Sequence, residues 1–264
     1  MTKLALLDGH SLAYRAFYAL PPDLATPSGQ VTNAVFGFTS MLIKLLAQEA
    51  PDAIAVAWDR SEPTFRSERY SEYKATRESA PDLFRSQVPI IKEVLEALEI
   101  PQVSAAGFEA DDVIATLLEQ GRDLGYDVLV VTGDRDAFQL SSSDVTILYT
   151  RKGISDTVHA TPEWIRERYG VSPERYVEYA ALRGDTSDNL PGVPGVGEKT
   201  AARLISEYSS LEELYEHLDD LTPKLRDNLE GAHDQVMLNR ELMTMVRDVP
   251  FDELSPEDLV LRPF

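Results

Sequence analysis

The fold of this chain is decided by the stretch Val128-Leu129-Val130-Val131-Thr132-Gly133-Asp134, a short apolar run that ends in a turn and an acid. Three more apolar runs of this kind occur, at residues 4–7, 53–58 and 145–149. Their apolar residues are continuous rather than alternating, which is typical of parallel strands that are covered on both faces. The four runs therefore predict the core strands of an α/β domain.

Helical patterns lie between these runs. Apolar residues recur at a helical period from Asn33 to Glu49, and similar patterns run from Pro89 to Leu98 and from Ala110 to Leu124. Strands that alternate with helices predict a doubly wound, mostly parallel central sheet flanked by helices. We expect this α/β core to occupy residues 1–160.

Residues 161–264 contain no further run of this kind and are predicted to form a helical subdomain. The pairs Thr161-Pro162 and Ser172-Pro173 are typical of helix starts, with a capping residue followed by Pro in the first turn. Within the core, residues 60–88 are polar and too long for a simple connection. We interpret them as a mobile or functional insertion.

Composition limits the class of protein. The chain has 264 residues, 43% hydrophobic content, no cysteine and a net charge of −20. No apolar run reaches the length of about 18 residues that a membrane-spanning helix needs. The lack of cysteine excludes disulfides and thiolate metal sites and favours a reducing cytoplasm. Because phosphate affinity comes from Lys and Arg, the net charge alone favours an enzyme that does not bind nucleic acid.

The acidity is unevenly distributed. Residues 205–264 hold 15 acidic and 5 basic side chains, whereas residues 60–85 hold 5 acidic and 6 basic ones. Acidic and basic charges in residues 60–85 therefore nearly cancel. Net charge alone does not show whether the protein binds DNA, and the sequence motifs are needed to predict it.

Acidic residues recur just past the carboxyl ends of the predicted strands, where catalytic groups lie in open α/β sheets. Five segments supply the nine acids, which are Asp8, Asp59, Glu109, Asp111, Asp112, Asp134, Asp136, Asp185 and Asp188. Taken singly, acids at a helix start favour the helix dipole, and Gly133-Asp134 is typical of a turn. The joint pattern instead predicts a metal site.

Carboxylates that converge in this number raise one another's pKa unless cations compensate their charge. Mg²⁺ and Mn²⁺ prefer oxygen ligands, and none of the four histidines lies in a spacing typical of zinc ligands. Two such ions about 4 Å apart can activate water and stabilise the leaving oxygen in phosphoryl transfer. We therefore expect two or more Mg²⁺ or Mn²⁺ ions.

A glycine-rich stretch from Leu190 to Ala202 is the second strong motif. Its glycines permit a tight hairpin with exposed amides, and a helix that starts near Glu198 can hold a phosphate at its N-terminus. Such contacts bind duplex DNA independently of its sequence, whereas the alternative is a Gly/Pro surface loop. The residues expected to contact DNA are Gly192, Gly195, Gly197, Lys199 and Thr200.

Aromatic and basic residues are interleaved at Tyr73, Lys74 and Arg77. This pattern can grip single-stranded DNA through stacking and phosphate contacts. A solvated face of charges gives the same pattern, so the motif is weak when taken alone.

These motifs follow one another in a characteristic order. They are Asp8-Gly9-His10-Ser11, Trp58-Asp59, Tyr73-Lys74-Ala75-Thr76-Arg77, Glu109-Ala110-Asp111-Asp112, Thr132-Gly133-Asp134-Arg135-Asp136 and Arg183-Gly184-Asp185-Thr186-Ser187-Asp188-Asn189. In this order the chain closely resembles the 5′ nucleases of the flap endonuclease family, which include the N-terminal domain of bacterial DNA polymerase I. The resemblance runs from about Lys3 to Val249, and His10 stands where relatives often have Asn or Ser.

The resemblance implies roles for the predicted site residues. A first metal ion would be surrounded by Asp8, Asp59, Glu109, Asp111 and Asp112, and a second by Asp134, Asp136, Asp185 and Asp188. Arg15, Lys74 and Arg77 would engage the scissile phosphate or the 5′ strand as catalytic residues. Residues 60–88 would form an arch over the 5′ end, and residues 192–200 a helix–hairpin–helix that binds K⁺.

The function expected from the resemblance is that of a structure-specific 5′ nuclease. Its substrates would be 5′ flaps, nicked or gapped duplexes and 5′ ends, in replication (Okazaki fragment processing) and repair. We expect a monomer in the bacterial cytoplasm, associated with the nucleoid, with a DNA polymerase domain as partner if the chain belongs to a longer protein.

Two alternatives stay open. One is a phosphatase with Asp8 as nucleophile, although such enzymes usually carry a second Asp where His10 stands. The other is a non-catalytic module that binds branched DNA, against which the presence of all nine carboxylates argues.

Overall fold

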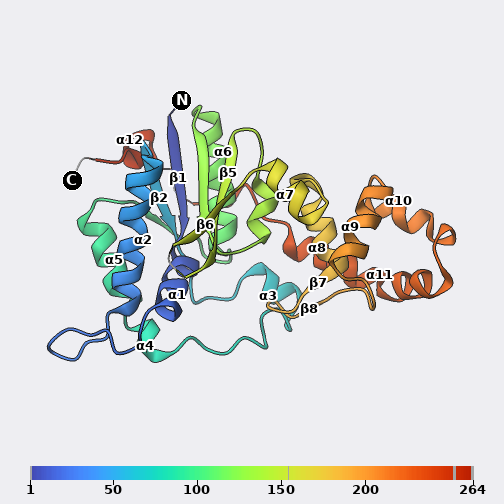
Figure 1. Ribbon diagram of the computed structural model, residues 1–264, viewed down its shortest axis with the longest axis horizontal. Coiled ribbons are helices and arrows are strands. Elements are labelled where there is room, and N and C mark those ends of the chain that lie inside the picture. Colours follow the sequence, from blue (N-terminus) through green and yellow to red (C-terminus); the bar gives the residue numbers. More distant parts are fainter. Residues whose placement is uncertain (1, 154, 252–253, 263–264) are drawn as a thin grey trace.

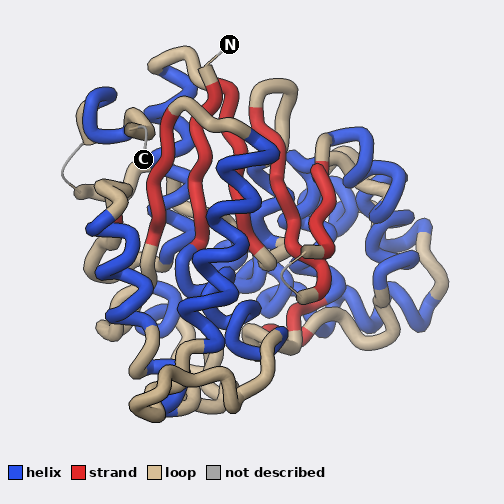
Figure 2. The backbone as a smooth tube through the Cα atoms, turned by 60° about the vertical axis from the view of Figure 1, so that its left-hand side comes forward, coloured by secondary structure: helices blue, strands red, loops and turns tan. Residues whose placement is uncertain are grey.

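The computed structural model describes residues 2–153, 155–251 and 254–262, and a six-stranded sheet forms its centre (Figures 1 and 2). The strand order is β3-β2-β1-β4-β5-β6, and neighbours are parallel except for β6, which runs antiparallel to β5. The strands are β1 (Lys3–Asp8), β2 (Ala53–Ala57), β3 (Gln102–Val103), β4 (Asp127–Thr132), β5 (Val145–Lys152) and β6 (Asp156–Ala160). The predicted mostly parallel sheet is confirmed.

The central strands are buried on both faces, which is why their sequences are continuously apolar. In β1, Leu4 and Leu6 belong to the core on one face of the sheet, and Ala5 and Leu7 to the core on the other. The four predicted strands correspond to β1, β2, β4 and β5. The sequence pattern does not predict β3 and β6, because β3 has only two residues and β6 is largely polar and partly exposed.

Helices cover both faces of the sheet (Figure 2). One face is covered by α1 (Gly9–Ala19), α2 (Asn33–Glu49) and α5 (Val88–Ala97), and the other by α6 (Ala110–Asp123) together with the helical part of the chain. The three predicted helices are confirmed as α2, α5 and α6. The unpredicted α1 begins directly after β1, where the Asp8 carboxylate caps it by accepting from the Ser11 N–H at 3.0 Å.

Residues 60–88 run across the carboxyl edge of the sheet (Figure 1). They contain only two short helices, α3 (Phe65–Arg69) and α4 (Asp82–Arg85). The prediction of a mobile insertion is not supported by their packing, because Arg66, Tyr73 and Phe84 are all buried. These buried side chains fasten the segment to the core, whereas residues 75–79 between Tyr73 and Phe84 are exposed.

The rest of the chain is helical, as predicted, apart from one short hairpin. Its helices are α7 (Pro162–Tyr169), α8 (Tyr176–Arg183), α9 (Glu198–Glu207), α10 (Leu211–Glu216), α11 (Pro223–Met243) and α12 (Pro256–Leu259). The hairpin consists of β7 (Gly184–Asp185) and β8 (Leu190–Pro191), and 3₁₀ turns lie at η2 (Pro173–Arg175) and η3 (Leu218–Asp220). A further 3₁₀ turn, η1 (Asp136–Leu140), lies between β4 and β5 of the sheet.

This helical part is not packed as a separate unit. Buried residues of α8, α9 and α11 belong to the same hydrophobic core as Leu4 and Leu6 of β1. The chain then returns to the sheet, where Val260 pairs with Ala53 of β2. The boundary expected near residue 160 therefore does not mark a break in packing. In the described part of the chain, no helix combines the length and apolarity that crossing a bilayer requires.

Candidate active site

A pocket of about 550 Å³ at the carboxyl edge of the sheet is lined by Glu78 and by five of the predicted metal ligands: Asp8, Asp59, Glu109, Asp111 and Asp134. Asp8 ends β1, whereas Asp59 and Asp134 follow the ends of β2 and β4. Because β1 lies between β2 and β4, the three strand ends bring these acids together. Glu109 and Asp111 come from the N-terminus of α6. We call these five predicted ligands the first acidic group.

Asp8 is buried, and both of its carboxylate oxygens accept hydrogen bonds. Oδ1 accepts from the Ser11 N–H at 3.0 Å, and Oδ2 accepts from the Thr132 hydroxyl at 2.9 Å. Burial, together with the charge of Asp59, raises the pKa of Asp8 to about 7 despite these hydrogen bonds. A nearby cation would relieve this unfavourable environment.

Two further acids of the group share this electrostatic strain. Burial and the charge of Asp8 raise the pKa of Asp111 well above its ordinary value. Burial also raises the pKa of Asp134, and the charge of Asp188 adds to the effect. The carboxylates of the first acidic group therefore repel one another, and the positive charge near them is too small to balance their negative charge.

Asp59 and Glu109 are held by neighbours rather than left free in the pocket. Asp59 Oδ1 accepts from the Ala110 N–H at 2.8 Å, and its own N–H donates to His10 Nδ1 at 3.2 Å. Glu109 Oε1 accepts from Lys74 Nζ at 2.8 Å. The sequence assigned no role to His10, yet His10 lines the pocket and packs edge-on against Trp58.

A second depression of about 590 Å³ adjoins the first and shares Asp134 with it. Asp185 lines this depression, where its Oδ1 accepts from the Ser187 N–H at 2.7 Å. Asp136 lies beside it, and burial and the charge of Asp134 raise the pKa of Asp136 well above its ordinary value. With the buried Asp188, these residues form the second acidic group, namely Asp134, Asp136, Asp185 and Asp188.

Asp188 joins the second acidic group to residues 60–88. Its Oδ1 accepts from Arg77 Nη2 at 2.5 Å, and its Oδ2 accepts from the Tyr73 hydroxyl at 2.9 Å. The backbone carbonyl of Asp188 also accepts from the Lys74 N–H at 2.9 Å. Lys74 itself has a φ of 56°, a left-handed conformation that few residues other than glycine adopt.

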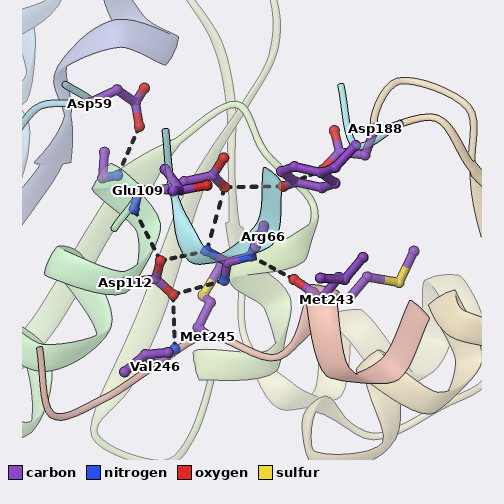
Figure 3. Close-up of polar contacts among 12 residues, drawn as sticks. Asp59, Arg66, Glu109, Asp112, Asp188, Met243, Met245 and Val246 are labelled. Atoms are coloured by element: carbon purple, nitrogen blue, oxygen red, sulfur yellow. Dashed lines mark hydrogen bonds and ion pairs between the residues drawn. The ribbon is translucent and has the colours of Figure 1, made fainter. Parts of the chain in front are cut away.

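Three predicted ligands line neither depression, namely Asp112, Asp136 and Asp188, and of these Asp112 is enclosed by partners in the core (Figure 3). It is fully buried, and both of its oxygens are engaged by Arg66 at 2.5 and 2.8 Å. The N–H groups of Glu109 and Val246 supply two more hydrogen bonds, at 3.1 and 2.9 Å. Consecutive helix positions differ by about 100° in direction, so Asp111 faces the pocket while Asp112 faces the core.

The structure places the three predicted catalytic cations near the acids. Lys74 and Arg77 line the first pocket. Arg15 lines an adjacent depression, where its Nη1 donates to the Arg151 carbonyl at 2.9 Å. Its guanidinium lies against Gly133, since a Cβ added there would be 2.7 Å from Arg15 Nη2.

Tyr73 was predicted to bind DNA as part of a basic and aromatic motif, but its ring is not exposed for stacking in this structure. The side chain is 7% exposed, and its ring packs within the core. Its hydroxyl instead shares its one proton between Glu109 Oε2 at 3.1 Å and Asp188 Oδ2 at 2.9 Å. Tyr73 therefore organises the acids and offers no surface to a base.

The glycine-rich motif begins in β8 and leads into α9, so its glycines follow the β7–β8 hairpin in the connection between α8 and α9. Gly195 has a φ of 77°, and Gly197 lies in open space before the first turn of α9, which contains Lys199 and Thr200. Gly192 has a different role, because any Cβ there would collide with the Arg183 carbonyl. Residues 193–196 form a turn in which the Val196 N–H donates to the Val193 carbonyl at 3.0 Å, and Gly192, one of the three glycines predicted to contact DNA, serves packing.

The donor set fits hard divalent cations. All candidate ligands are carboxylates, which suit Mg²⁺ or Mn²⁺, and the raised pKa values of Asp8, Asp111, Asp134 and Asp136 show that their negative charge is under-compensated. Among the residues described, no three acidic or histidine side chains converge closely enough to hold an ion as they stand. Glu109 and Asp188 are held by Lys74 and Arg77, so side-chain rotation would have to accompany metal binding.

Several residues of the site were missed by sequence reasoning. Ser11 and Thr132 hold Asp8, and Arg66 holds Asp112. The position of Thr132 at the end of a predicted strand is a signal that could have found it. Arg66 lies 46 residues from its partner in a segment without periodicity, so the sequence holds no such signal.

Comparison with known families covers nearly the whole chain. The family model described as 5′-3′ exonuclease, N-terminal resolvase-like domain, matches residues 3–170, and that described as 5′-3′ exonuclease, C-terminal SAM fold, matches residues 171–264. DNA polymerase I of Mycobacterium tuberculosis is 57% identical over 99% of this chain, and that of Bacillus subtilis is 44% identical over 95%. The chain spans 29% and 28% of the length of these two relatives.

Solved structures share the fold at low sequence identity. The zinc-bound T5 5′-exonuclease has a TM-score of 0.77 and 22% identity, covering 92% of this chain and 90% of its own. The catalytic core of Rad2 in complex with DNA has a TM-score of 0.60 and 20% identity, covering 95% of this chain and 81% of its own. The α/β sheet with its helical extension is thus an architecture seen before.

Proposed function

The chain belongs to the 5′-3′ exonuclease family, and on that premise we propose that it hydrolyses DNA phosphodiesters at junctions between single strands and duplex. Its substrates would be 5′ flaps, nicks, gaps and free 5′ ends. The observation that carries the proposal is the pocket that Lys74 and Arg77 line together with six carboxylates, five of which belong to the first acidic group. Acids alone would repel a phosphodiester, and the two cations provide the attraction.

Divalent metal ions would be held by the two acidic groups. We assign Asp8, Asp59, Glu109 and Asp111 to one ion, and Asp134, Asp136, Asp185 and Asp188 to another, with Mg²⁺ or Mn²⁺ as the metal. Asp112 is left out because all four of its hydrogen bonds are made within the protein. When bound, such ions polarise phosphoryl oxygens and lower the pKa of water.

The cationic side chains have roles of their own. A phosphate in the pocket would lie within reach of Lys74 and Arg77, whose charges offset the negative charge that builds up on phosphoryl oxygens in the transition state. Arg15 lies in the adjacent depression, where it would contact the strand beyond the reacting phosphate. Residues 60–88, which carry both Lys74 and Arg77, would confine the 5′ strand as an arch.

Duplex DNA would be held by the hairpin between α8 and α9, acting as a helix–hairpin–helix. The first turn of α9 follows Gly197, and its amide groups suit a backbone phosphate. Glu198 in that turn lies 3.6 Å from Arg135, which follows Asp134 in sequence, so the duplex-binding element is tied to the site. The proposal further includes a K⁺ ion at this hairpin and a monomeric state. It places the protein in the bacterial cytoplasm at the nucleoid, with roles in replication and repair. It also includes a linked DNA polymerase domain.

Cleavage of a 5′-flap duplex in single-turnover assays with Mg²⁺ or Mn²⁺ tests the function. We expect Asp134→Asn to bind DNA normally and to lose cleavage, because Asp134 lines both depressions. The matched control is Asp144→Asn, whose carboxylate is paired with Arg122 outside both depressions. Undiminished metal-dependent cleavage by Asp134→Asn would contradict the metal assignment, and a wild-type protein that binds but never cuts would leave only a DNA-binding module.

A further inference from the structure

We propose that Arg66 and Asp112 are positioning residues, whose buried ion pair fastens residues 242–246 to the two segments that present Lys74 and Glu109. We call residues 242–246 the strap. The inference deepens the proposed nuclease function and rests on it.

Three hydrogen bonds join the ion pair to the backbone of the strap, close to the residues labelled in Figure 3. Arg66 donates to the backbone carbonyl of Leu242 at 2.6 Å and to that of Thr244 at 3.2 Å. Asp112 accepts from the Val246 N–H at 2.9 Å. Arg66 is 3% exposed and Asp112 is 0% exposed, so these contacts are shielded from water.

The same ion pair reaches the first acidic group. Asp112 Oδ2 accepts from the Glu109 N–H at 3.1 Å, and Arg66 Nη1 lies 3.6 Å from Glu109 Oε2. Arg66 also lies on α3, directly before the turns that carry Tyr73 and Lys74. The pair thus fixes the backbone that presents Glu109 and the segment that presents its partner Lys74.

A second fastening ties the strap to the other acidic group. Gln139 donates from Nε2 to the Met243 carbonyl at 2.9 Å and accepts at Oε1 from the Met245 N–H at 3.0 Å. The same Nε2 donates to the backbone carbonyl of Asp136 at 2.9 Å. The strap therefore contacts both sides of the site, although it contributes no side chain to either depression.

The physical chemistry of buried charge explains why the pair acts as a unit. A buried ion pair is stable only when its remaining donors and acceptors are satisfied, and here both carboxylate oxygens and all three guanidinium nitrogens have partners. Removing one partner leaves an uncompensated charge in the core. A change at Arg66 or Asp112 should therefore displace the strap and the segments attached to it.

Thermal unfolding separates positioning from metal binding, with Asp111→Asn as the matched control for Asp112→Asn. In EDTA, Asp112→Asn should lower the unfolding midpoint, because Arg66 loses its counter-charge. Asp111→Asn should raise the midpoint or leave it unchanged, because it removes a repelling charge from the pocket. On addition of Mg²⁺, Asp112→Asn should keep the stabilisation seen in the wild type, and Asp111→Asn should lose most of it.

Equal loss of the Mg²⁺ response in both variants would make Asp112 a ligand and overturn the inference. An unchanged midpoint for Asp112→Asn in EDTA would overturn it as well. If Mg²⁺ and Mn²⁺ fail to stabilise even the wild type, the proposed metal site fails. The EDTA comparison still decides the positioning role in that case.

Steady-state cleavage well below the unfolding midpoint tests positioning directly. Arg66→Met should lower kcat by about tenfold or more with KM nearly unchanged, because small displacements of reacting groups are costly. Arg66→Lys should restore part of this loss. Arg122→Met, which removes a guanidinium paired with Asp144 and Glu119 outside both depressions, should match the wild type. If Arg66→Met does not fold, Arg66→Lys and Gln139→Ala carry the test, and normal kcat in both would show that the strap has no catalytic effect.

Discussion

Tyr73 donates a hydrogen bond to Asp188 at 2.9 Å across 115 positions of sequence. The same hydroxyl lies 3.1 Å from Glu109 Oε2. One phenol therefore connects an acid of the first acidic group with an acid of the second, and it fixes their separation while the ring stays buried.

Removing this hydroxyl should affect catalysis more than DNA binding. We expect Tyr73→Phe to lower the cleavage rate by up to about tenfold, the equivalent of one or two hydrogen bonds. Affinity for single-stranded DNA should be unchanged, because the ring is not accessible for stacking. Fluorescence anisotropy with an oligonucleotide checks the affinity, with Tyr70→Phe as the control. Because Phe keeps the aromatic ring, Tyr73→Leu tests stacking itself, and a marked loss of affinity in Tyr73→Leu but not in Tyr73→Phe would restore the stacking role.

The metal-free protein should lose stability as the pH rises from about 4 to 7. The pKa of Asp8 in the folded state is about 7, above its ordinary value of 3.8, so the folded state binds this proton more tightly than the unfolded state does. The free energy of unfolding therefore falls across that window, by at most about 1.4 kcal/mol per pH unit for one group. Asp111, Asp134 and Asp136 act in the same direction.

Thermal unfolding in EDTA between pH 4 and 8 measures this slope. Asp8→Asn should flatten it, whereas Asp144→Asn, outside the pocket, should leave it in place. A wild-type midpoint that rises steadily over the same pH range would be incompatible with the raised pKa of Asp8.

Two glycines between β8 and α9, Gly192 and Gly197, should respond differently to substitution by alanine. Gly192→Ala places a methyl group against the Arg183 carbonyl, and we expect destabilisation by about 2 kcal/mol or more. Gly197→Ala meets no atom within 4 Å, so stability should be nearly unchanged and only duplex affinity should fall. Unfolding midpoints and binding to blunt duplex DNA make the comparison. Similar midpoints for the two variants would contradict the packing role of Gly192.

The left-handed backbone of Lys74 suggests a test that separates charge from strain. Lys74→Met and Lys74→Gly both remove the cation, so both should lose most of the cleavage activity. Only Lys74→Gly relieves the φ of 56°, and it should be the more stable of the two variants by about 1 kcal/mol. Activity that returns with Lys74→Gly would mean that backbone shape, and not charge, is the contribution of this residue.

Much of the fold could be predicted because the central strands carry their own signal. Leu4 to Leu7 are apolar on both faces, and three of the four such runs lead directly to an acid of the site. The strand ends then had to converge, because parallel strands present their carboxyl ends at one edge. β3 and α1 escaped prediction because one is two residues long and the other lacks a separating loop after Asp8.

The site was harder to predict than the fold, since it depends on where neighbouring side chains point. Asp111 and Asp112 are identical in type and adjacent in sequence, yet one lines the pocket and the other is paired with Arg66 in the core. The burial of Tyr73 likewise depends on residues more than 30 positions away. Long-range partners of this kind leave no trace in local periodicity.

Both ends of the described chain lie at the amino edge of the sheet, opposite the pocket (Figure 1). The Asp52 N–H donates to the Lys3 carbonyl and the Leu261 N–H donates to the Asp52 carbonyl, each at 2.9 Å, which joins the two ends there. A bead, dye or sensor surface attached through either end would therefore lie on the side of the molecule opposite the pocket. Long branched DNA should reach an immobilised protein as freely as one in solution, which makes the chain suited to single-molecule cleavage measurements.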